Sequence, residues 1–177
     1  MRWYSTSGVA AIAVALTACS PTPDAGTATT AGRRATVALR TADGKTVGDA
    51  TIRESADGLV VSLTVAGMTP GMHGAHLHAV GKCDGPDFAS AGPHWNPTGT
   101  KHGSMNPAGP HEGDLPNLMI GADGKGTLTY KVAGGRFDAL LDADGAALVI
   151  HAAPDDLKTD PSGNSGGRIA CGVLVAS

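Results

Sequence analysis

Hydrophobic and polar residues alternate along much of the chain after residue 34, which is typical of strands with one buried face. The alternation is clearest over residues 58–66, where Leu59, Val61, Leu63 and Val65 are separated by single residues. Asp-Gly pairs, the strongest short signal for a hairpin turn, interrupt such runs at residues 43–44, 57–58, 123–124 and 144–145. The pattern predicts eight strands, near residues 35–40, 46–54, 58–66, 73–80, 117–122, 125–132, 146–152 and 168–175.

Short strands with frequent turns and almost no helical periodicity predict an all-β fold. We expect an eight-stranded antiparallel Greek-key β-sandwich or barrel with two long functional loops. These loops are residues 82–115, rich in Gly, Pro, His and Asn, and residues 154–167, rich in Asp, Ser and Gly. Loops of this length are usually functional or disordered. His94, His102 and His111 in the first loop argue against disorder.

The N-terminal residues have the composition of an export signal. One cation, Arg2, precedes the apolar run VAAIAVAL at residues 9–16, which is too short to span a bilayer and suits a signal peptide. The run ends in LTAC, which resembles the lipobox of bacterial lipoproteins and predicts lipidation of Cys19. The alternative is an ordinary signal cut nearby, which would leave three cysteines with one unpaired.

Three regions follow from this composition. Residues 1–18 are predicted to be a lipoprotein-type signal peptide, and residues 19–34, mostly Pro, Thr, Ala and Gly, a flexible tether. Residues 35–177 are long enough for one domain with its own core. We expect an exported protein of the periplasm or cell envelope, anchored to a membrane through Cys19. Export also favours a disulfide between Cys83 and Cys171.

Charge excludes one class of partner. The formal net charge is −3, and no block of basic residues is present that would indicate nucleic acid or anionic lipid as a partner. The expected contact with a membrane is through the N-terminal lipid anchor, and no nucleic-acid partner is expected.

The histidines suggest metal binding. Three of the seven fall in HGAHLH at residues 73–78, and His76 and His78, two apart on an expected strand, should point to the same face. A single His-x-His motif is weak evidence for a metal site. However, residues 82–115 add His94, His102, His111 and Asp114, and His151 follows the apolar run AALVI. Imidazole suits zinc and copper, and zinc accepts a carboxylate. Six histidines and a carboxylate exceed the needs of one metal, so two neighbouring sites are expected, although spacing alone does not pair ligands with metals.

Five motifs make the chain similar to a known family. They are HGAHLH (73–78), SAGPHWNPTGTKHG (90–103), HEGDLPNL (111–118), HAAPDD (151–156) and GGRIACGV (166–173). In these motifs and their order the chain resembles the bacterial copper,zinc superoxide dismutases, over essentially all of residues 35–177. Two departures are Trp95, where many members carry Phe, and a loop at residues 154–167 that is shorter than in many animal relatives.

The resemblance implies one copper and one zinc per subunit. It assigns copper to His76, His78, His94 and His151, and zinc to His94, His102, His111 and Asp114, with the His94 ring bridging the two metals. Asp155 resembles the carboxylate that links a copper ligand to a zinc ligand. Cys83 and Cys171 resemble the family's disulfide pair. His73 is not a ligand position, which predicts a structural or hydrogen-bonding role.

The implied activity is dismutation of superoxide to dioxygen and hydrogen peroxide, which would protect the cell envelope. The resemblance gives catalytic roles to His94, as a proton carrier, and to Arg168, beside copper. Superoxide is an anion, so a local positive charge should speed its capture. Arg168 is the expected cation, and Lys158 is either a second one or an ordinary solvated lysine. Lys101 is assigned no role.

Two other functions compete with this interpretation. An exported copper- and zinc-binding module without dismutase activity would be expected to lack a ligand or the arginine, and the sequence lacks neither. A structural or adhesive sandwich would have no use for six histidines and an aspartate at these positions. Whether the protein is a monomer or a homodimer is left open.

Overall fold

The computed structural model describes residues 1–3 and 32–177. The expected signal peptide, Cys19 and most of the expected tether lie outside the described residues. Within the described part of the chain, no helix has the length and apolar character needed to cross a membrane.

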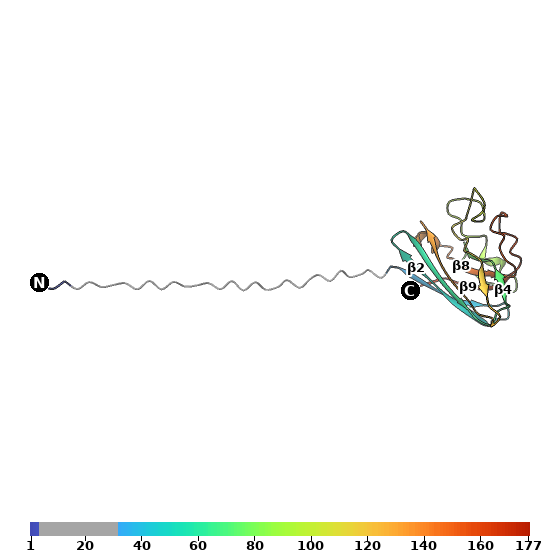
Figure 1. The fold of residues 1–177 in the computed structure, drawn as a ribbon, viewed down its shortest axis with the longest axis horizontal. Helices are drawn as coiled ribbons and strands as arrows, with labels where there is room; N and C mark the ends of the chain where they lie inside the picture. The colour runs from blue at the N-terminus through green and yellow to red at the C-terminus, as the bar shows by residue number, and fades with distance from the viewer. Residues whose placement is uncertain (4–31) are drawn as a thin grey trace. The chain divides into compact units, whose positions relative to one another are not determined.

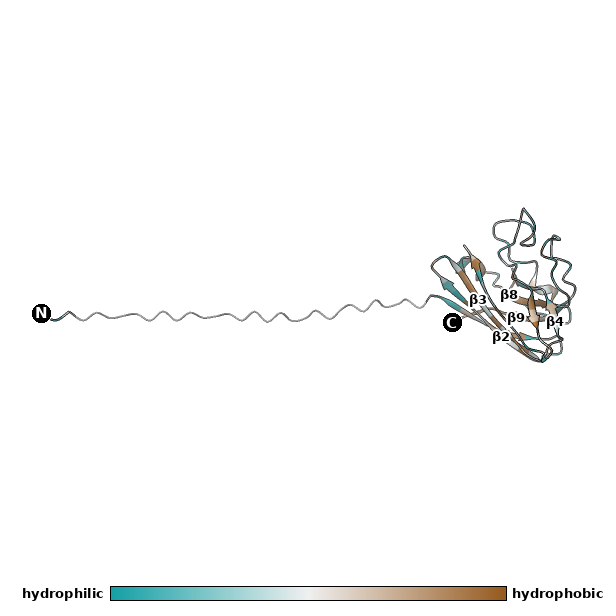
Figure 2. Cartoon of the chain, viewed as in Figure 1, coloured by the Kyte–Doolittle hydropathy of each residue, from teal (hydrophilic) through white to brown (hydrophobic). Residues whose placement is uncertain are grey.

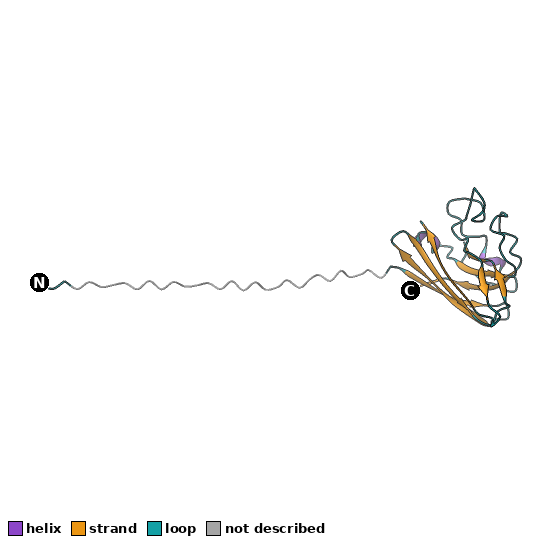
Figure 3. Cartoon of the chain, in the orientation of Figure 1, coloured by secondary structure: helices purple, strands orange, loops and turns teal. Residues whose placement is uncertain are grey.

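Ten strands form one antiparallel sheet, with two very short helices between them (Figure 3). The elements are, in chain order, β1 (Arg34–Arg40), β2 (Thr46–Ser55), β3 (Gly58–Val65), β4 (Gly71–His73), β5 (Ala75–His78), η1 (Ala89–Ala91), β6 (Leu118–Ile120), β7 (Gly126–Ala133), α1 (Phe137–Leu140), β8 (Ala147–His151), β9 (Arg168–Val173) and β10 (Val175–Ala176).

The sheet curls until its two ends nearly meet. Its strand order is β4-β6-β7-β3-β2-β1-β9-β8-β5, with β10 paired to β1. The two end strands, β4 and β5, are consecutive in the chain and separated by Gly74 alone. The two edges of the sheet therefore come together at this glycine, as in a barrel. The pairings β3–β7 and β1–β9 join strands that are distant in sequence, as in Greek-key folds.

The predicted all-β antiparallel class is confirmed, but the predicted count of eight strands is wrong. The expected strand at residues 73–80 is two strands, since β4 pairs with β6 whereas β5 pairs with β8. Gly74 stands at the break, where the backbone passes so close to Ser165 that a Cβ at residue 74 would lie 2.8 Å from Cβ of Ser165. The expected last strand is also divided, into β9 and β10. The Asp-Gly turns are present, with positive φ at all four glycines.

Alternation along β1, β2 and β3 builds the core. The inward side chains of β3, from Leu59 to Val65, are at most 2% exposed, and they pack with Leu39 and Ile52 in one continuous cluster. Figure 2 shows the corresponding mixture of apolar and polar colour along β2 and β3. β8 differs, because all five of its residues are buried. A strand covered on both faces reads as a continuous apolar run rather than an alternation.

The two long loops lie beside each other at one end of the strands (Figure 1). They are residues 82–115, drawn in green to yellow, and residues 154–167, drawn in red. Several hydrogen bonds join them, including Met105 N–H to Leu157 O at 2.8 Å. The predicted disulfide between Cys83 and Cys171 is present and ties the first loop to β9. It closes 88 residues of chain, which in the chain-entropy account stabilises the fold by about 4–5 kcal/mol.

Replacing Leu63 with Ala should destabilise the domain by about 2–5 kcal/mol, because Leu63 is 2% exposed in the main core. The matched variant is Thr64→Ala on the outer face of the same strand, with an expected loss below about 1 kcal/mol. Denaturant unfolding of both variants measures the difference. Equal losses would contradict the inward and outward assignment of β3.

Candidate metal centre

The site begins on β5, whose four residues Ala-His-Leu-His are all buried. Alternation along the strand sends His76 and His78 to one side and Leu77 into the main apolar core. Both histidines are fully buried. The strand therefore holds two imidazoles rigidly, with a leucine as the anchor between them.

Four histidines form the first cluster: His76, His78, His94 and His151. One ligand atom from each lies within 4.8 Å of the others. In each ring the second nitrogen is held by a fixed acceptor: His76 Nε2 contacts Asp155 at 2.7 Å, His78 Nδ1 contacts Gly92 O at 2.9 Å, His94 Nδ1 contacts Asp114 at 2.9 Å and His151 Nδ1 contacts Gly166 O at 3.2 Å.

The remaining four nitrogens of this cluster have no hydrogen-bond partner in the described part of the chain. They are His76 Nδ1, His78 Nε2, His94 Nε2 and His151 Nε2. Among the described residues, no other buried side-chain nitrogen or oxygen atom lacks a hydrogen-bond partner. A buried polar atom without a partner is unfavourable by about 1–3 kcal/mol. Four of them facing one point is the arrangement that a metal ion satisfies.

The second cluster surrounds Asp114. One carboxylate oxygen, Oδ1, lies 2.9 Å from Nδ1 of His94, 3.0 Å from Nδ1 of His102 and 3.2 Å from Nδ1 of His111. The other oxygen accepts the backbone N–H groups of Gly103 and His111 at 2.8 and 3.0 Å. Three ring nitrogens around one oxygen exceed its two lone pairs, so a cation among these four groups fits the donor set.

Distance alone also places His76 near Asp114, in a group with His94 and His102. The rings of His76 and His94 are stacked with their centroids 3.9 Å apart, which explains why His76 lies near Asp114. However, Nε2 of His76 is bonded to Asp155, and its other nitrogen belongs to the first cluster. His111 faces Asp114 with a ring nitrogen and is the better fourth member.

His94 belongs to both clusters. Its Nδ1 faces Asp114, and its Nε2 is one of the four unpartnered nitrogens. Asp155 connects the clusters a second time, since Oδ2 contacts Nε2 of His76 at 2.7 Å and Oδ1 contacts Nε2 of His102 at 3.0 Å. The backbone of Gly163 packs directly against this contact. A side chain cannot be accommodated at residue 163, because a Cβ there would lie 1.8 Å from Asp155 Oδ1.

The protonation behaviour of the two clusters differs. Burial lowers the pKa of His78 to about 2, of His94 to about 4 and of His151 to about 3, so these rings are neutral and able to bind a metal. Burial alone would raise the pKa values of Asp114 and Asp155, but hydrogen bonds from His102 and its neighbours outweigh burial and hold both well below their usual range. The second cluster therefore offers an ionised carboxylate, Asp114, to a divalent cation.

His102 behaves differently from the first cluster. Burial lowers its pKa, but contacts to Asp114 and Asp155 outweigh this and raise the pKa to about 9. The attraction of two carboxylates for a proton at this position is also an attraction for a metal cation.

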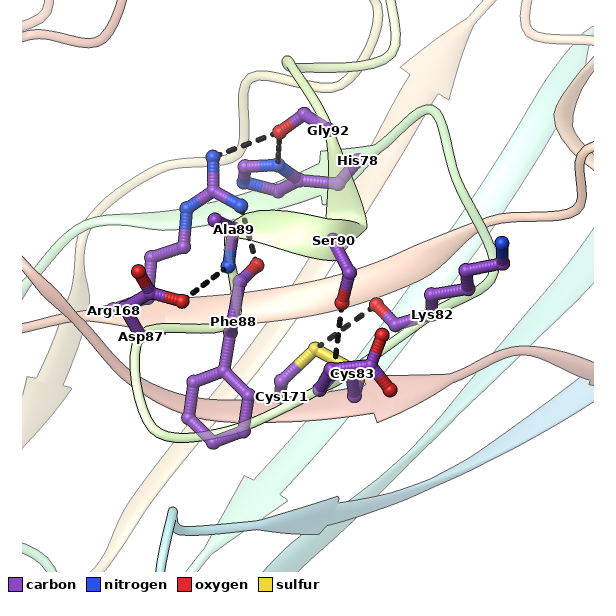
Figure 4. Close-up of a disulfide and its surroundings, with 11 residues drawn as sticks. His78, Lys82, Cys83, Asp87, Phe88, Ala89, Ser90, Gly92, Arg168 and Cys171 are labelled. Carbon is purple, nitrogen blue, oxygen red and sulfur yellow. Dashed lines mark hydrogen bonds between the residues drawn. A yellow bond between two sulfur atoms is a disulfide. The ribbon is translucent and has the colours of Figure 1, made fainter.

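The first cluster opens to solvent through a pocket of about 550 Å³, whose lining includes His94, His111, His151 and Arg168 but no carboxylate. The Arg168 guanidinium donates to Phe88 O at 2.6 Å and to Gly92 O at 2.7 Å. Figure 4 shows that Gly92 O also accepts from His78, and that the disulfide holds the same stretch of chain. The pocket thus presents a fixed positive charge to an entering anion.

The two lysines considered from the sequence do not line this pocket. Lys158 is exposed, and Lys101 pairs with Asp160 at 3.0 Å. A hollow of about 620 Å³ lies on the other side of the disulfide, but its lining contains no histidine or carboxylate. The chemistry of the site is therefore confined to the histidine side.

His73 takes no part in either cluster. Its ring nitrogens contact His151 O at 2.8 Å and Thr69 O at 3.0 Å, so neither is free for a metal. The predicted hydrogen-bonding role of His73 is confirmed. Site residues also contact groups that were not predicted from the sequence: Asn117, Asp160 and the carbonyl groups of Gly92 and Gly166. Carbonyl groups carry no sequence signal, because every residue has one.

Comparison with known proteins agrees with this geometry. A family model described as copper/zinc superoxide dismutase (SODC) matches residues 46–174. The chain is 47% identical over 148 residues to a Cu-Zn superoxide dismutase of Caulobacter vibrioides, covering 79% of this chain and 84% of the relative. It is 44% identical over 149 residues to a superoxide dismutase-like protein of Bacillus subtilis, covering 80% of this chain and 76% of the relative.

Solved structures show the same relationship. A SOD-like protein from Bacillus subtilis superposes with a TM-score of 0.75 at 41% identity, covering 79% of this chain and 97% of that one. The Cu/Zn superoxide dismutase from Brucella abortus superposes with a TM-score of 0.66 at 33% identity, covering 80% and 99%. With its antiparallel barrel, its two histidine clusters and these matches, the chain belongs to the copper/zinc superoxide dismutase family.

Proposed function

We propose that this protein dismutates superoxide, with copper held by His76, His78, His94 and His151, and zinc held by His94, His102, His111 and Asp114. The observation that carries the proposal is the convergence of four buried imidazole nitrogens that have no protein partner. Imidazole donors suit copper, and three imidazoles with a carboxylate suit zinc. Family membership supports the choice of these two metals.

Bound copper supplies the one-electron chemistry by which two superoxide ions and two protons become dioxygen and hydrogen peroxide. The residues of the chain supply position and protons. Asp155 and the carbonyl groups of Gly92 and Gly166 fix the rings of His76, His78 and His151. Fixed rings keep the donor atoms in one arrangement through repeated turnover.

His94 is placed to carry a proton. Its Nδ1 is held on the Asp114 side, so Nε2 can take up a proton and deliver it to reduced superoxide while the ring stays in place. Nε2 belongs to a ring that also lines the open pocket, where the anion arrives.

Arg168 attracts and orients the substrate. Its guanidinium donates to two backbone carbonyl groups, so the positive charge keeps a fixed position beside the pocket. No carboxylate lines the pocket to oppose it. A fixed local charge of this kind concentrates a small anion although the whole chain carries −3.

The family also contains a protein whose name is only dismutase-like, so membership alone does not decide between an enzyme and a metal-binding module. The complete ligand set and the fixed arginine favour the enzyme, because a module that only stores metal has no need of a cation beside an open pocket.

We also propose that the domain spans residues 35–177 and is exported to the periplasm or cell envelope. The supporting observations are the apolar run at residues 9–16, the LTAC sequence ending at Cys19 and the tether composition up to residue 34. Incorporation of labelled palmitate into the expressed chain, and its loss in Cys19→Ala, measures the proposed anchor.

His151→Ala should reduce superoxide decay to the uncatalysed rate and lower copper content while leaving zinc bound, because His151 belongs to the first cluster only. Stopped-flow decay of superoxide and metal analysis of the purified protein measure both effects. If the parent holds both metals and leaves superoxide untouched, the protein is a metal-binding module instead.

Arg168→Ala should slow superoxide decay about tenfold or more and weaken its dependence on ionic strength, because the fixed cation of the pocket is removed. The parallel variant Lys158→Ala tests steering by that lysine: a slower rate supports it, and an unchanged rate makes Lys158 an ordinary solvated side chain. A rate for Arg168→Ala equal to the parent at every salt concentration contradicts the steering role of Arg168.

A further inference from the structure

Asn117 makes an unusual contact with the backbone of Asp155. Its side-chain amide donates to Asp155 O at 2.8 Å, and its side-chain oxygen accepts from Asp155 N–H at 2.7 Å. One side chain therefore satisfies both backbone groups of a residue that is 38 positions away in sequence. Such a paired contact fixes the orientation of the Asp155 backbone as well as its position.

Asp155 depends on this contact because it belongs to no strand. It lies in the loop at residues 154–167, and its backbone makes none of the ladder bonds that fix His76 and His151 in β5 and β8. Its carboxylate is nevertheless shared between Nε2 of His76 and Nε2 of His102. A small rotation of the Asp155 backbone would move both oxygens away from both rings.

Asn117 is itself rigidly placed. It follows Asp114 by three residues and directly precedes β6, which pairs with both β4 and β7. The contact therefore runs from the sheet, through one amide, to the carboxylate between the two clusters. Asp114, Asn117, Asp155 and His102 form a closed circuit of covalent and hydrogen bonds, since His102 returns to Asp114 at 3.0 Å.

We propose that Asn117 is a positioning residue for both metal clusters, which acts by holding Asp155 in the orientation that fixes His76 and His102. The proposal rests on the proposed function only for the identity of the two metals. Loss of a partner of the ligands, as Asp155 is, typically changes metal affinity 10- to 100-fold, and loss of Asn117 should act at the lower end of this range because it displaces Asp155 without removing it.

A second asparagine also binds the loop at residues 154–167 through its side-chain amide, but away from Asp155. Asn106, in the loop at residues 82–115, donates its side-chain amide to Lys158 O at 3.2 Å. This bond is likewise from an amide to the backbone, but it lies at an exposed position and leaves Asp155 untouched. Asn106→Ala is therefore the matched control for Asn117→Ala.

The test compares metal binding by the parent, Asn117→Ala and Asn106→Ala. Competition with a zinc chelator should show zinc affinity about tenfold lower in Asn117→Ala and within about twofold of the parent in Asn106→Ala. The electron paramagnetic resonance spectrum of bound Cu(II) should change in Asn117→Ala only, because Asp155 also orients His76. Equal zinc affinities in the two variants, or a copper spectrum identical to the parent, overturn the proposal.

A second variant covers the case in which Asn117→Ala does not fold. Asn117→Asp keeps the shape and the acceptor for Asp155 N–H but places a carboxylate oxygen against Asp155 O. It should lower zinc affinity by a similar factor, and parent-like affinity would overturn the proposal. These readouts use no superoxide, so they test the role of Asn117 independently of the enzyme activity. A parent that binds both metals without dismutase activity would contradict the proposed function, and the role of Asn117 would still be decided by the metal-binding results.

Discussion

Four imidazole nitrogens buried without a protein partner set the central constraint of this structure. Each would be unfavourable by about 1–3 kcal/mol if it stayed unsatisfied, and hydrogen bonds among the four cannot remove the problem because the other nitrogen of each ring is already committed. The fold must therefore supply enough stability elsewhere to keep these atoms together. A metal ion answers the constraint directly, and the proposed copper site follows from it.

Strands and loops of the barrel each supply part of the two clusters. β5 and β8 bring His76, His78 and His151 from paired strands, and Leu77 anchors β5 in the apolar core. The loop at residues 82–115 brings His94, His102, His111 and Asp114, and its backbone is hydrogen-bonded to β5 on both sides of Leu77. The disulfide, Arg168 and Asp155 fix it further, from β9 and from the loop at residues 154–167. Groups that attract substrate or tune the ligands thus also hold the loops in place.

Much of the fold and the candidate site could be predicted from the sequence. The strands carried period-two patterns, the Asp-Gly pairs marked real turns, and the histidines of both clusters stood out in a chain with few aromatic residues. The break at Gly74 could not be predicted, because it arises from the pairing of β4 and β5 with two different strands, β6 and β8, that are distant in the sequence. The backbone acceptors Gly92 O and Gly166 O could not be predicted either. Asn117 was visible in HEGDLPNL but had no assignable role until the loop at residues 154–167 was in place.

The most direct test of the account is the identity of the metal at each cluster. Anomalous X-ray diffraction, measured on both sides of the copper and zinc absorption edges with crystals of the loaded protein, locates each element separately. The account predicts copper among the four unpartnered nitrogens of His76, His78, His94 and His151, and zinc beside Asp114, with the ring of His94 between them. A single metal position, or zinc among the four nitrogens with no copper, would contradict it.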